Sequence, residues 1–454
     1  MTRWVVATLA GLAIGIVYAL SPATAWFAVA MWAVHRYAIN GLDVDERRWV
    51  TAIFVVAVAL RVAAVAALFA TTNHAVKPFG FFVGDEEFYI RRSIWLRNVA
   101  LGVPIHSADL IYAFDESGWT SHLYVLSFAQ VLFGPSPYGV HLMGVAFYLT
   151  GAFMLFRLVR RPFGRAPALL GLIVILFLPS FFAWSISALK EPLYLLLTVI
   201  CISLAMTVVR SGRWTVRVGA LVALLAVIAA IGTIRDGGIV LASAGILLGL
   251  GIAWAIRRPR VLIAAFIALP MLVGATLRDP ARQIQAYLLV NRAARQHWGH
   301  VATPGWVYTL LDDRFYRDAS SIGDMNFRDE ARFVVRAFER YVTVPLPWEA
   351  QSTAALTYLP EQLVWYCIVA LLPFGLVFSW RRDALLASLL VSIACVSAAA
   401  IALLSGNVGT LVRLRVLAIP YLATLSMVGL CELLARPLRR QTAPVFEKAD
   451  PTWP

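Results

Sequence analysis

Acidic and aromatic residues gather in one polar segment, Gly84–Trp95, which is the strongest candidate in the chain for acid–base chemistry. The segment begins Gly-Asp-Glu-Glu-Phe-Tyr, so Asp85, Glu86 and Tyr89 lie within six residues. A carboxylate fixed at a helix start can accept a proton from a hydroxyl or hold a divalent metal ion. The same carboxylates would also stabilise the positive end of the helix dipole, and the two roles are compatible. We therefore expect Asp85 and Glu86 to be catalytic and Tyr89 to contact substrate.

Two arginines in the last quarter of the chain are the main candidates for binding a phosphate. Arg413 and Arg415 follow a glycine-rich turn, Gly406–Thr410. Open backbone N–H groups beside an arginine suit an anion. Membrane anchoring is the alternative role for these arginines, but anchors of this kind belong on the cytoplasmic side, and this turn is expected on the other side. Asn407, inside the turn, is a candidate for substrate binding.

Lys190 and Arg235 are two further candidates for the donor phosphate. Lys190 is one of only three lysines in the chain. Each cation precedes a carboxylate in the sequence, Glu191 and Asp236 respectively. A structural ion pair with that neighbour explains each of them as well as a ligand does.

The segment Pro345–Ser352 holds the remaining candidates for substrate binding. Its two prolines predict an extended stretch that presents Trp348 and Glu349. Tryptophan stacks on sugars, although an aromatic belt at a membrane surface explains it equally well. His297 and His300 form only a weak ligand pair, so metal dependence is left open: a divalent metal at Asp85 is neither required nor excluded.

The amino-acid composition is typical of a membrane protein. Of its 454 residues, 61% are hydrophobic and 14% charged, and the mean hydropathy is +0.77, which excludes a water-soluble enzyme. The net charge of +14 comes from 39 basic against 25 acidic residues. Because the basic residues cluster between apolar runs, they indicate contact with membrane lipid and not with nucleic acid.

Apolar runs of bilayer length predict an all-α polytopic membrane protein with twelve transmembrane helices, or thirteen if Trp119–Phe133 also crosses. We interpret Trp119–Phe133 as a segment that dips into the membrane, because a crossing there would turn every later arginine cluster outward. The twelve expected spans are Trp4–Leu20, Ala23–Ile39, Trp49–Ala70, Tyr138–Phe156, Ala166–Ser185, Pro192–Val209, Val218–Ile234, Ile239–Ile256, Val261–Leu277, Glu361–Trp380, Ala384–Leu404 and Val416–Leu434.

With these spans, the arginine clusters fall on one side, which the positive-inside rule makes the cytoplasm. Two long polar loops, 71–118 and 278–360, then face outward, and loops of this length are usually functional. The expected organisation is an N-terminal membrane module (1–277), the large outer loop (278–360), C-terminal helices (361–435) and a cytoplasmic tail (436–454). Within the large loop, residues 329–342 have one apolar face and predict an amphipathic helix at the membrane interface.

Three motifs carry a family resemblance: Gly84-Asp-Glu-x-x-Tyr89, Leu132-Phe-Gly-Pro-Ser-Pro137 and Arg160-Arg-Pro-Phe-Gly-Arg165. With the alternation of apolar spans, they resemble the polyprenyl-phosphate-dependent GT-C glycosyltransferases, which include protein O-mannosyltransferases and the lipid A aminoarabinose transferase. The resemblance is clearest from Gly84 to Val209. It implies a GT-C-like fold and an acceptor-binding role for Asp85, with Glu86 as its neighbour. The expected hairpin Trp4–Ile39 departs from the family pattern.

The leading hypothesis is thus an extracytoplasmic glycosyltransferase in a bacterial inner membrane. Its partners would be a polyprenyl-phosphate or polyprenyl-diphosphate sugar donor and a cell-envelope glycan, lipid or protein acceptor. The alternatives are a polysaccharide polymerase or ligase, a flippase or other transporter, and an assembly subunit. A transporter should carry several charges at mid-span, whereas Arg61 is nearly alone there. An enzyme requires Asp85 and Arg413 or Arg415 to face a common cavity near the outer surface.

Overall fold

The computed structural model describes residues 22–76, 84–116, 118–135, 138–276, 278–302, 307–349 and 358–441, and a few residues before position 13. Over these residues the regular secondary structure is helical, apart from one isolated β-bridge between Val307 and Asn407. Seven of the described helices are long and apolar enough to cross a bilayer, or nine if each of two bent helix pairs is one span. The chain is therefore a polytopic helical membrane protein.

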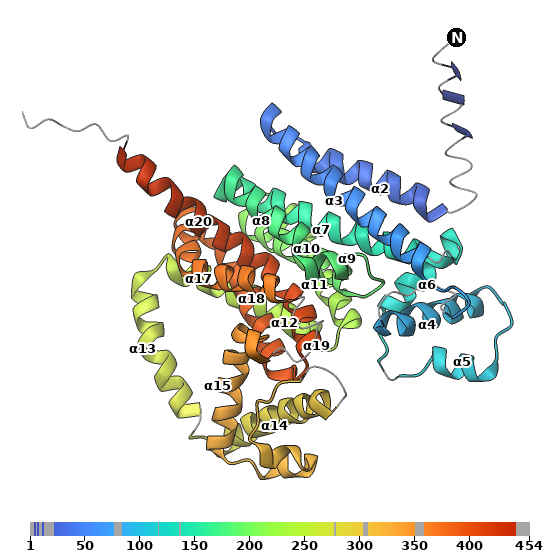
Figure 1. The fold of residues 1–454 in the computed structure, drawn as a ribbon. Coiled ribbons are helices and arrows are strands. Elements are labelled where there is room, and N and C mark those ends of the chain that lie inside the picture. Colours follow the sequence, from blue (N-terminus) through green and yellow to red (C-terminus); the bar gives the residue numbers. More distant parts are fainter. Residues whose placement is uncertain are drawn as a thin grey trace, which may run out of the picture.

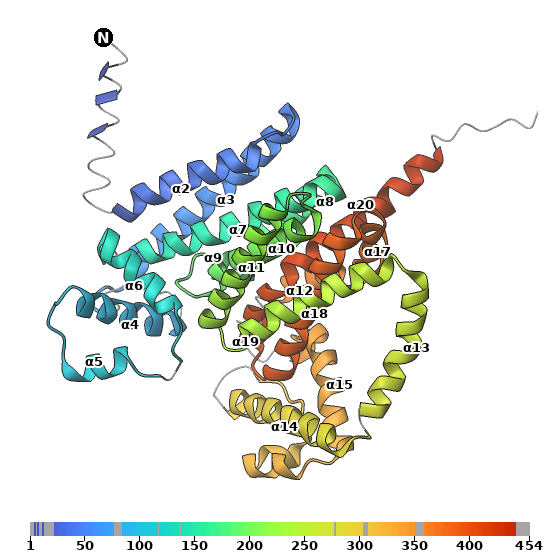
Figure 2. The same cartoon turned by 180° about the vertical axis from the view of Figure 1, so that it is seen from behind.

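The long helices form one bundle in which the two halves of the chain interlock. In the C-terminal half, α18 packs against α12, and α20 packs against both α17 and α8. Helix α13 runs along the edge of the bundle (Figures 1 and 2). The long helices are α2 (Pro22–Ile39), α3 (Val44–Thr71), α7 (Gly139–Phe163), α8 (Arg165–Phe177), α10 (Glu191–Arg210), α11 (Trp214–Ile234), α12 (Gly238–Ile256), α13 (Pro259–Thr276), α17 (Leu359–Arg382), α18 (Ala384–Leu404) and α20 (Ile419–Gln441).

The expected spans from Ala23 onward coincide with helices, but α2 and α13 belong neither to the seven crossings nor to the two bent pairs. The first expected span, Trp4–Leu20, and the tail beyond residue 441 lie largely or wholly outside the described residues. Helix α6 (His122–Phe133) covers most of the run 119–133. Its 12 residues extend about 18 Å, which is too short to cross a hydrocarbon core of about 30 Å.

Two expected spans are broken and not straight. Helices α8 and α9 (Pro179–Ser185) meet at an angle of 64°. Because a residue before proline avoids the helical conformation, Leu178 is extended, with φ −61° and ψ 127°, and α8 ends there. The second break, of 66°, separates α19 (Val408–Leu414) and the short helix η4 (Arg415–Leu417) from α20.

The two polar loops fold into helical groups at the same end of the bundle, which we call the loop-bearing end (Figure 1). The first group contains α6 and the helices α4 (Gly84–Ala100) and α5 (Ser107–Ala113). The second contains α14 (Pro280–Ala302), α15 (Phe327–Thr343) and three short 3₁₀ helices, η1 (Asp313–Tyr316), η2 (Ala319–Asp324) and η3 (Pro347–Glu349).

The expected interfacial helix at 329–342 is α15, but protein and not a membrane surface covers much of its apolar face. Phe333, Ala337 and Tyr341 are buried, and α15 packs on α14 and α18. Val335 and Phe338 stay exposed. The helix therefore fastens the large loop to the bundle.

The basic clusters expected on one side of the membrane meet at the end of the bundle opposite the loops. Ion pairs connect the turn after α2 to the turn after α7, and the turn after α10 to the turn after α17. Arg382 also donates to the carbonyl oxygen of Phe163 at the end of α7, which places the four turns together. The pairs are Arg160–Glu46, Arg165–Asp43, Arg210–Asp383 and Arg382–Glu432. The side chains expected to share the cytoplasmic face thus share one end of the molecule.

The crossing of α17 and α20 depends on two glycines, which let the helix backbones touch. A Cβ at Gly375 would overlap the carbonyl oxygen of Leu425, and one at Gly429 would lie 2.7 Å from the amide nitrogen of Gly375. We expect Gly375→Val to destabilise the protein by about 1–3 kcal/mol or more through overpacking. Thermal unfolding in detergent, followed by tryptophan fluorescence, measures the loss. Gly251→Val in α12, where a Cβ meets nothing within 4 Å, is the matched control, and equal midpoints for the two variants would contradict the close crossing.

Candidate functional site

A pocket of about 390 Å³ opens at the loop-bearing end, and we call it the polar pocket. Segments that are far apart in the sequence build its wall: α4, the turn before α10, the end of α11, α14 and α19. The lining residues are Asp85, Phe88, Tyr89, Leu189, Lys190, Glu191, Arg235, Gln296, His300, Thr410, Arg413 and Leu414. Five of the residues singled out in the sequence, from Asp85 to Arg413, are among them.

Arg413 is the centre of the polar pocket because it lies between two carboxylates. Its Nη1 donates a short hydrogen bond to Oδ2 of Asp85. Its Nε lies 3.6 Å from Oε1 of Glu191, with no hydrogen bond. The side chain of Asp85 is 59% exposed and that of Glu191 only 4%. Arg413 thus holds a buried carboxylate on one side and an accessible one on the other.

Local capping sets the position of Arg413. Asn407 caps α19, because its Oδ1 accepts hydrogen bonds from the amides of Gly409 (2.8 Å) and Thr410 (3.4 Å). The short helix then ends with Arg413 in its last turn. Asn407, expected to contact substrate, does not line the polar pocket and has a capping role.

Lys190 and Arg235 line the polar pocket without the ion pairs that their sequence neighbours suggested. Among the described residues, neither has a carboxylate oxygen within 4 Å. Nη1 of Arg235 is buried and has no hydrogen-bond partner in the described part of the chain, while its guanidinium lies 5.9 Å from the ring centre of Tyr194. Burial, together with the charge of Arg235, lowers the pKa of Lys190. Three cations therefore face two carboxylates.

Three buried polar atoms of the polar pocket have no hydrogen-bond partner within the described part of the chain. They are Oε2 of Glu191, Nε of Arg413 and Nη1 of Arg235. Buried polar atoms are normally hydrogen-bonded, because an unpaired one loses its hydration without compensation. Tyr89, in the same wall, has its pKa raised to about 12, chiefly by burial, so it remains a hydroxyl donor at neutral pH.

Glu86, expected to be catalytic, faces away from the polar pocket. It is fully buried, and its carboxylate accepts a hydrogen bond of 3.0 Å from the amide of Ala188 and lies 3.3 Å from Nε2 of His141. These contacts join α4 to α7 and to the turn before α10. Glu86 therefore holds the start of α4 in place, and with it the neighbouring residue Asp85.

Arg415, expected to bind phosphate with Arg413, is also outside the polar pocket. Its buried guanidinium donates to Oε1 of Gln362 at 2.9 Å and to the carbonyl oxygens of Val344, at 2.6 Å, and Tyr341. It lies over the rings of Tyr341 and Trp365. An arginine engaged in this way ties η4 to α15 and α17 and has no contact with the pocket.

Trp348 and Glu349, expected to bind substrate, lie in η3 and do not line the polar pocket. The side chain of Trp348 is 79% exposed. Within the segment expected to be extended, Pro347–Glu349 form a short 3₁₀ helix, and residues 350–352 lie outside the described residues.

Helix α14 adds Gln296 and His300 to the pocket lining. The sequence singled out His300 only as half of a weak metal-ligand pair and did not single out Gln296. His300 is held by a contact of 2.9 Å between Nδ1 and the carbonyl oxygen of Leu404. His297 lies 2.6 Å from the hydroxyl of Tyr316, and burial lowers the pKa of His297 to about 4, so its ring is neutral at pH 7. The sequence of α14 shows a polar face, but no feature of the sequence predicts that this face lies near Arg413.

Within the described residues, no group of three or more His, Cys, Asp or Glu is arranged to hold a metal ion.

Comparison with known proteins gives no further guidance. No protein-family model, no curated protein and no solved structure matches the chain. The GT-C resemblance therefore rests on the motifs alone, and function has to be argued from the geometry of the site.

The two carboxylates beside Arg413 should differ in their effect on stability. Removing the cation leaves Glu191 buried and unpaired, so we expect Arg413→Gln to cost about 3 kcal/mol. Adding Glu191→Gln to that variant should recover most of the loss, whereas Asp85→Asn alone should cost under about 1 kcal/mol, because the carboxylate is exposed. Unfolding midpoints in detergent measure all three. A double variant no more stable than Arg413→Gln would contradict the pairing of Arg413 with Glu191.

Proposed function

We propose that the protein is a membrane glycosyltransferase that moves a sugar from a polyprenyl-phosphate or polyprenyl-diphosphate donor to a hydroxyl of a cell-envelope glycan, lipid or protein. Its site would open on the outer face of a bacterial cytoplasmic membrane. The observation that carries the proposal is the polar pocket, in which an accessible carboxylate, Asp85, lies among three cations. This is the set of groups that such a transfer requires.

The reaction needs a base and a cationic site for the leaving group. In the proposed step, the acceptor oxygen attacks the anomeric carbon of the sugar, and its proton passes to the carboxylate of Asp85. The bond between the anomeric carbon and the phosphate oxygen breaks, and its electron pair stays on that oxygen. Arg413, Lys190 and Arg235 would stabilise the negative charge that develops on the leaving phosphate.

The ion pair between Asp85 and Arg413 fits a resting state of such an enzyme. A phosphate is a stronger ligand for a guanidinium than a single exposed carboxylate, because it offers several charged oxygens to the N–H groups. Donor binding would therefore draw Arg413 to the phosphate and release Asp85. The released carboxylate would then be available to the acceptor hydroxyl.

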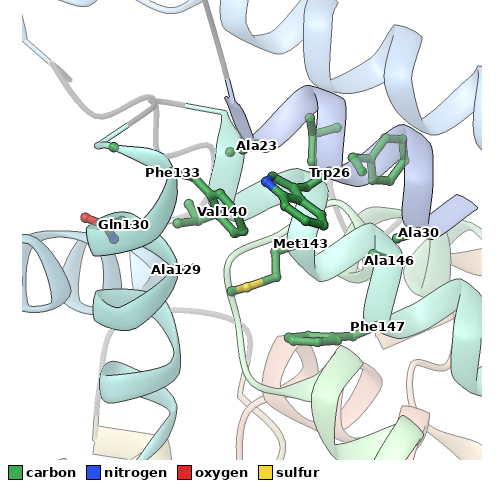
Figure 3. A pocket seen from close by; sticks show the side chains of 14 residues that line it. Ala23, Trp26, Ala30, Ala129, Gln130, Phe133, Val140, Met143, Ala146 and Phe147 are labelled. Atoms are coloured by element: carbon green, nitrogen blue, oxygen red, sulfur yellow. The ribbon is translucent and has the colours of Figure 1, made fainter. Parts of the chain in front are cut away.

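A neighbouring apolar pocket of about 230 Å³ supports a donor that carries a hydrocarbon chain (Figure 3). Trp26, Phe133, Met143 and Phe147 project into it from α2, α6 and α7, and Gln130 lies at its edge. A thin layer of apolar side chains separates it from the polar pocket. That layer contains Ile90, Val140 and Ala188, with Tyr89 and Met143 packed against it.

The one mid-span charge noted in the sequence gives no support to a transporter. Arg61 is fully buried, and its guanidinium donates to Oγ of Ser185 at 2.7 Å and to the carbonyl oxygens of Leu176 at 2.8 Å and Ala57 at 3.2 Å. An arginine bound in this way serves the packing of α3 against α8 and α9. The polar pocket, in contrast, brings three cations and two carboxylates together at the loop-bearing end.

Binding of a phosphorylated isoprenoid tests the proposal. Farnesyl phosphate is added to the detergent-purified protein, and native mass spectrometry measures the bound fraction, with farnesol as the uncharged control. We expect wild type to prefer farnesyl phosphate, and Arg413→Ala/Lys190→Ala to lose about tenfold or more in affinity, because two charge-assisted contacts disappear. Arg278→Ala/Arg282→Ala, which removes two charges outside the pocket, should bind as wild type does. Equal binding of farnesyl phosphate and farnesol would overturn a phosphate site.

Asp85→Asn separates binding from transfer. The amide keeps the shape of the side chain but cannot act as a base, so we expect farnesyl phosphate binding to persist. Membranes of cells that carry Asp85→Asn should accumulate the natural donor, and the rate of sugar transfer should fall by about 10²–10⁴-fold. Lipid mass spectrometry of wild-type and variant membranes measures the donor and gives the sugar from its mass. A transfer rate in Asp85→Asn equal to that of wild type would remove Asp85 from the chemistry.

A further inference from the structure

A second charged pocket, of about 310 Å³, lies at the end of the bundle opposite the polar pocket, where α7 and α10 end. We call it the arginine pocket. Helix α10 begins at Glu191 in the polar pocket and ends at Arg210 in the arginine pocket, and its 20 residues extend about 30 Å. The polar lining residues are Tyr37, Arg157, Arg161, Ser203 and Arg210. The two pockets are therefore about one hydrocarbon thickness apart.

Two of the three arginines have charges that nothing nearby neutralises. Arg210 bonds to both carboxylate oxygens of Asp383. Arg157 and Arg161, in contrast, have no carboxylate oxygen within 4 Å among the described residues. They are four residues apart on α7, so they share a face and repel each other. Arg157 meets only the ring of Tyr37, at 5.9 Å.

Some arginines at this end of the bundle have counter-ions. On the next face of the same helix, Arg160 is paired with Glu46, and Arg165 after the helix lies near Asp43. Arg157 and Arg161 differ from exposed arginines that have no ion pair among the described residues, such as Arg213, because both line one pocket. An anion between Arg157 and Arg161 would relieve their repulsion.

The wall of the arginine pocket is apolar on the side that faces the middle of the bundle. Met154 and Leu158 on α7, and Val199 and Met206 on α10, form this wall. Charge is thus confined to the rim at the helix ends, and the apolar surface continues along the helices that cross the membrane. A phospholipid has the same arrangement of charged and apolar groups, because its phosphate lies at the interface and its chain lies along the helices. A free phosphate would make no favourable contact with the apolar wall.

We propose that the arginine pocket binds an anionic phospholipid, whose phosphate lies between Arg157 and Arg161 and one of whose chains lies along Met154 and Val199. The hydroxyls of Tyr37 and Ser203 are placed to donate to the headgroup. This site is separate from the polar pocket and does not depend on the proposed enzymatic activity.

The test compares two lipids with the same chains. The full-length protein in detergent is titrated with phosphatidylglycerol or phosphatidylcholine, and native mass spectrometry counts the lipid that stays bound. We expect wild type to prefer phosphatidylglycerol and Arg157→Gln/Arg161→Gln to bind it about tenfold or more weakly. Ser203→Trp, which fills the pocket without removing charge, should weaken binding as well. Unfolding midpoints measured without lipid show that each variant is folded.

The control is Arg213→Gln/Arg257→Gln, which removes two charges from exposed turns that do not line the arginine pocket. It should bind phosphatidylglycerol as wild type does. A loss as large as that of Arg157→Gln/Arg161→Gln would mean general attraction to charge and overturn the site. Displacement of the lipid by millimolar inorganic phosphate, or equal binding of the two lipids, would overturn an anionic phospholipid as the ligand.

Discussion

The contact of Arg413 with Asp85 and Glu191 is the interaction on which the site depends. It joins α19, near the end of the chain, to α4 and to the start of α10. A buried cation that lacks a counter-ion loses its hydration at a high free-energy cost, so these three elements are held at one spacing. The same contact leaves Asp85 accessible, which is what makes the polar pocket chemically useful and not only a structural ion pair.

Five other arginines hold the bundle together through bonds to backbone carbonyls. The last turn of a helix leaves four carbonyl oxygens without a helical donor, and in a membrane protein no water reaches those that are buried. The guanidinium group, with five donors in a rigid fork, satisfies several of them at once. The helix ends bound in this way are those of α5 by Arg92, α6 by Arg97, α7 by Arg382, α8 by Arg61 and α15 by Arg415.

The two ends of the bundle differ in how their charged side chains are distributed. At the end opposite the loops, cations outnumber carboxylates, and only some of them are paired across helix turns, which suits an anionic lipid surface. At the loop-bearing end, cations converge with carboxylates in a single concave pocket. Helix α10 has one end in each environment.

Hydropathy and charge clusters in the sequence were enough to determine the membrane class, the position of most helices and the gathering of the basic turns at one end, because each depends on local composition. The sequence also singled out Asp85 and Arg413, which share a pocket. Only the tertiary structure decided that Arg415 and Glu86 are buried away from that pocket, that Glu191 pairs with Arg413 and that α14 closes the site. The direction of one side chain, and a break such as that at Leu178, depend on the distant segments packed around them, and no local pattern in the sequence records that packing.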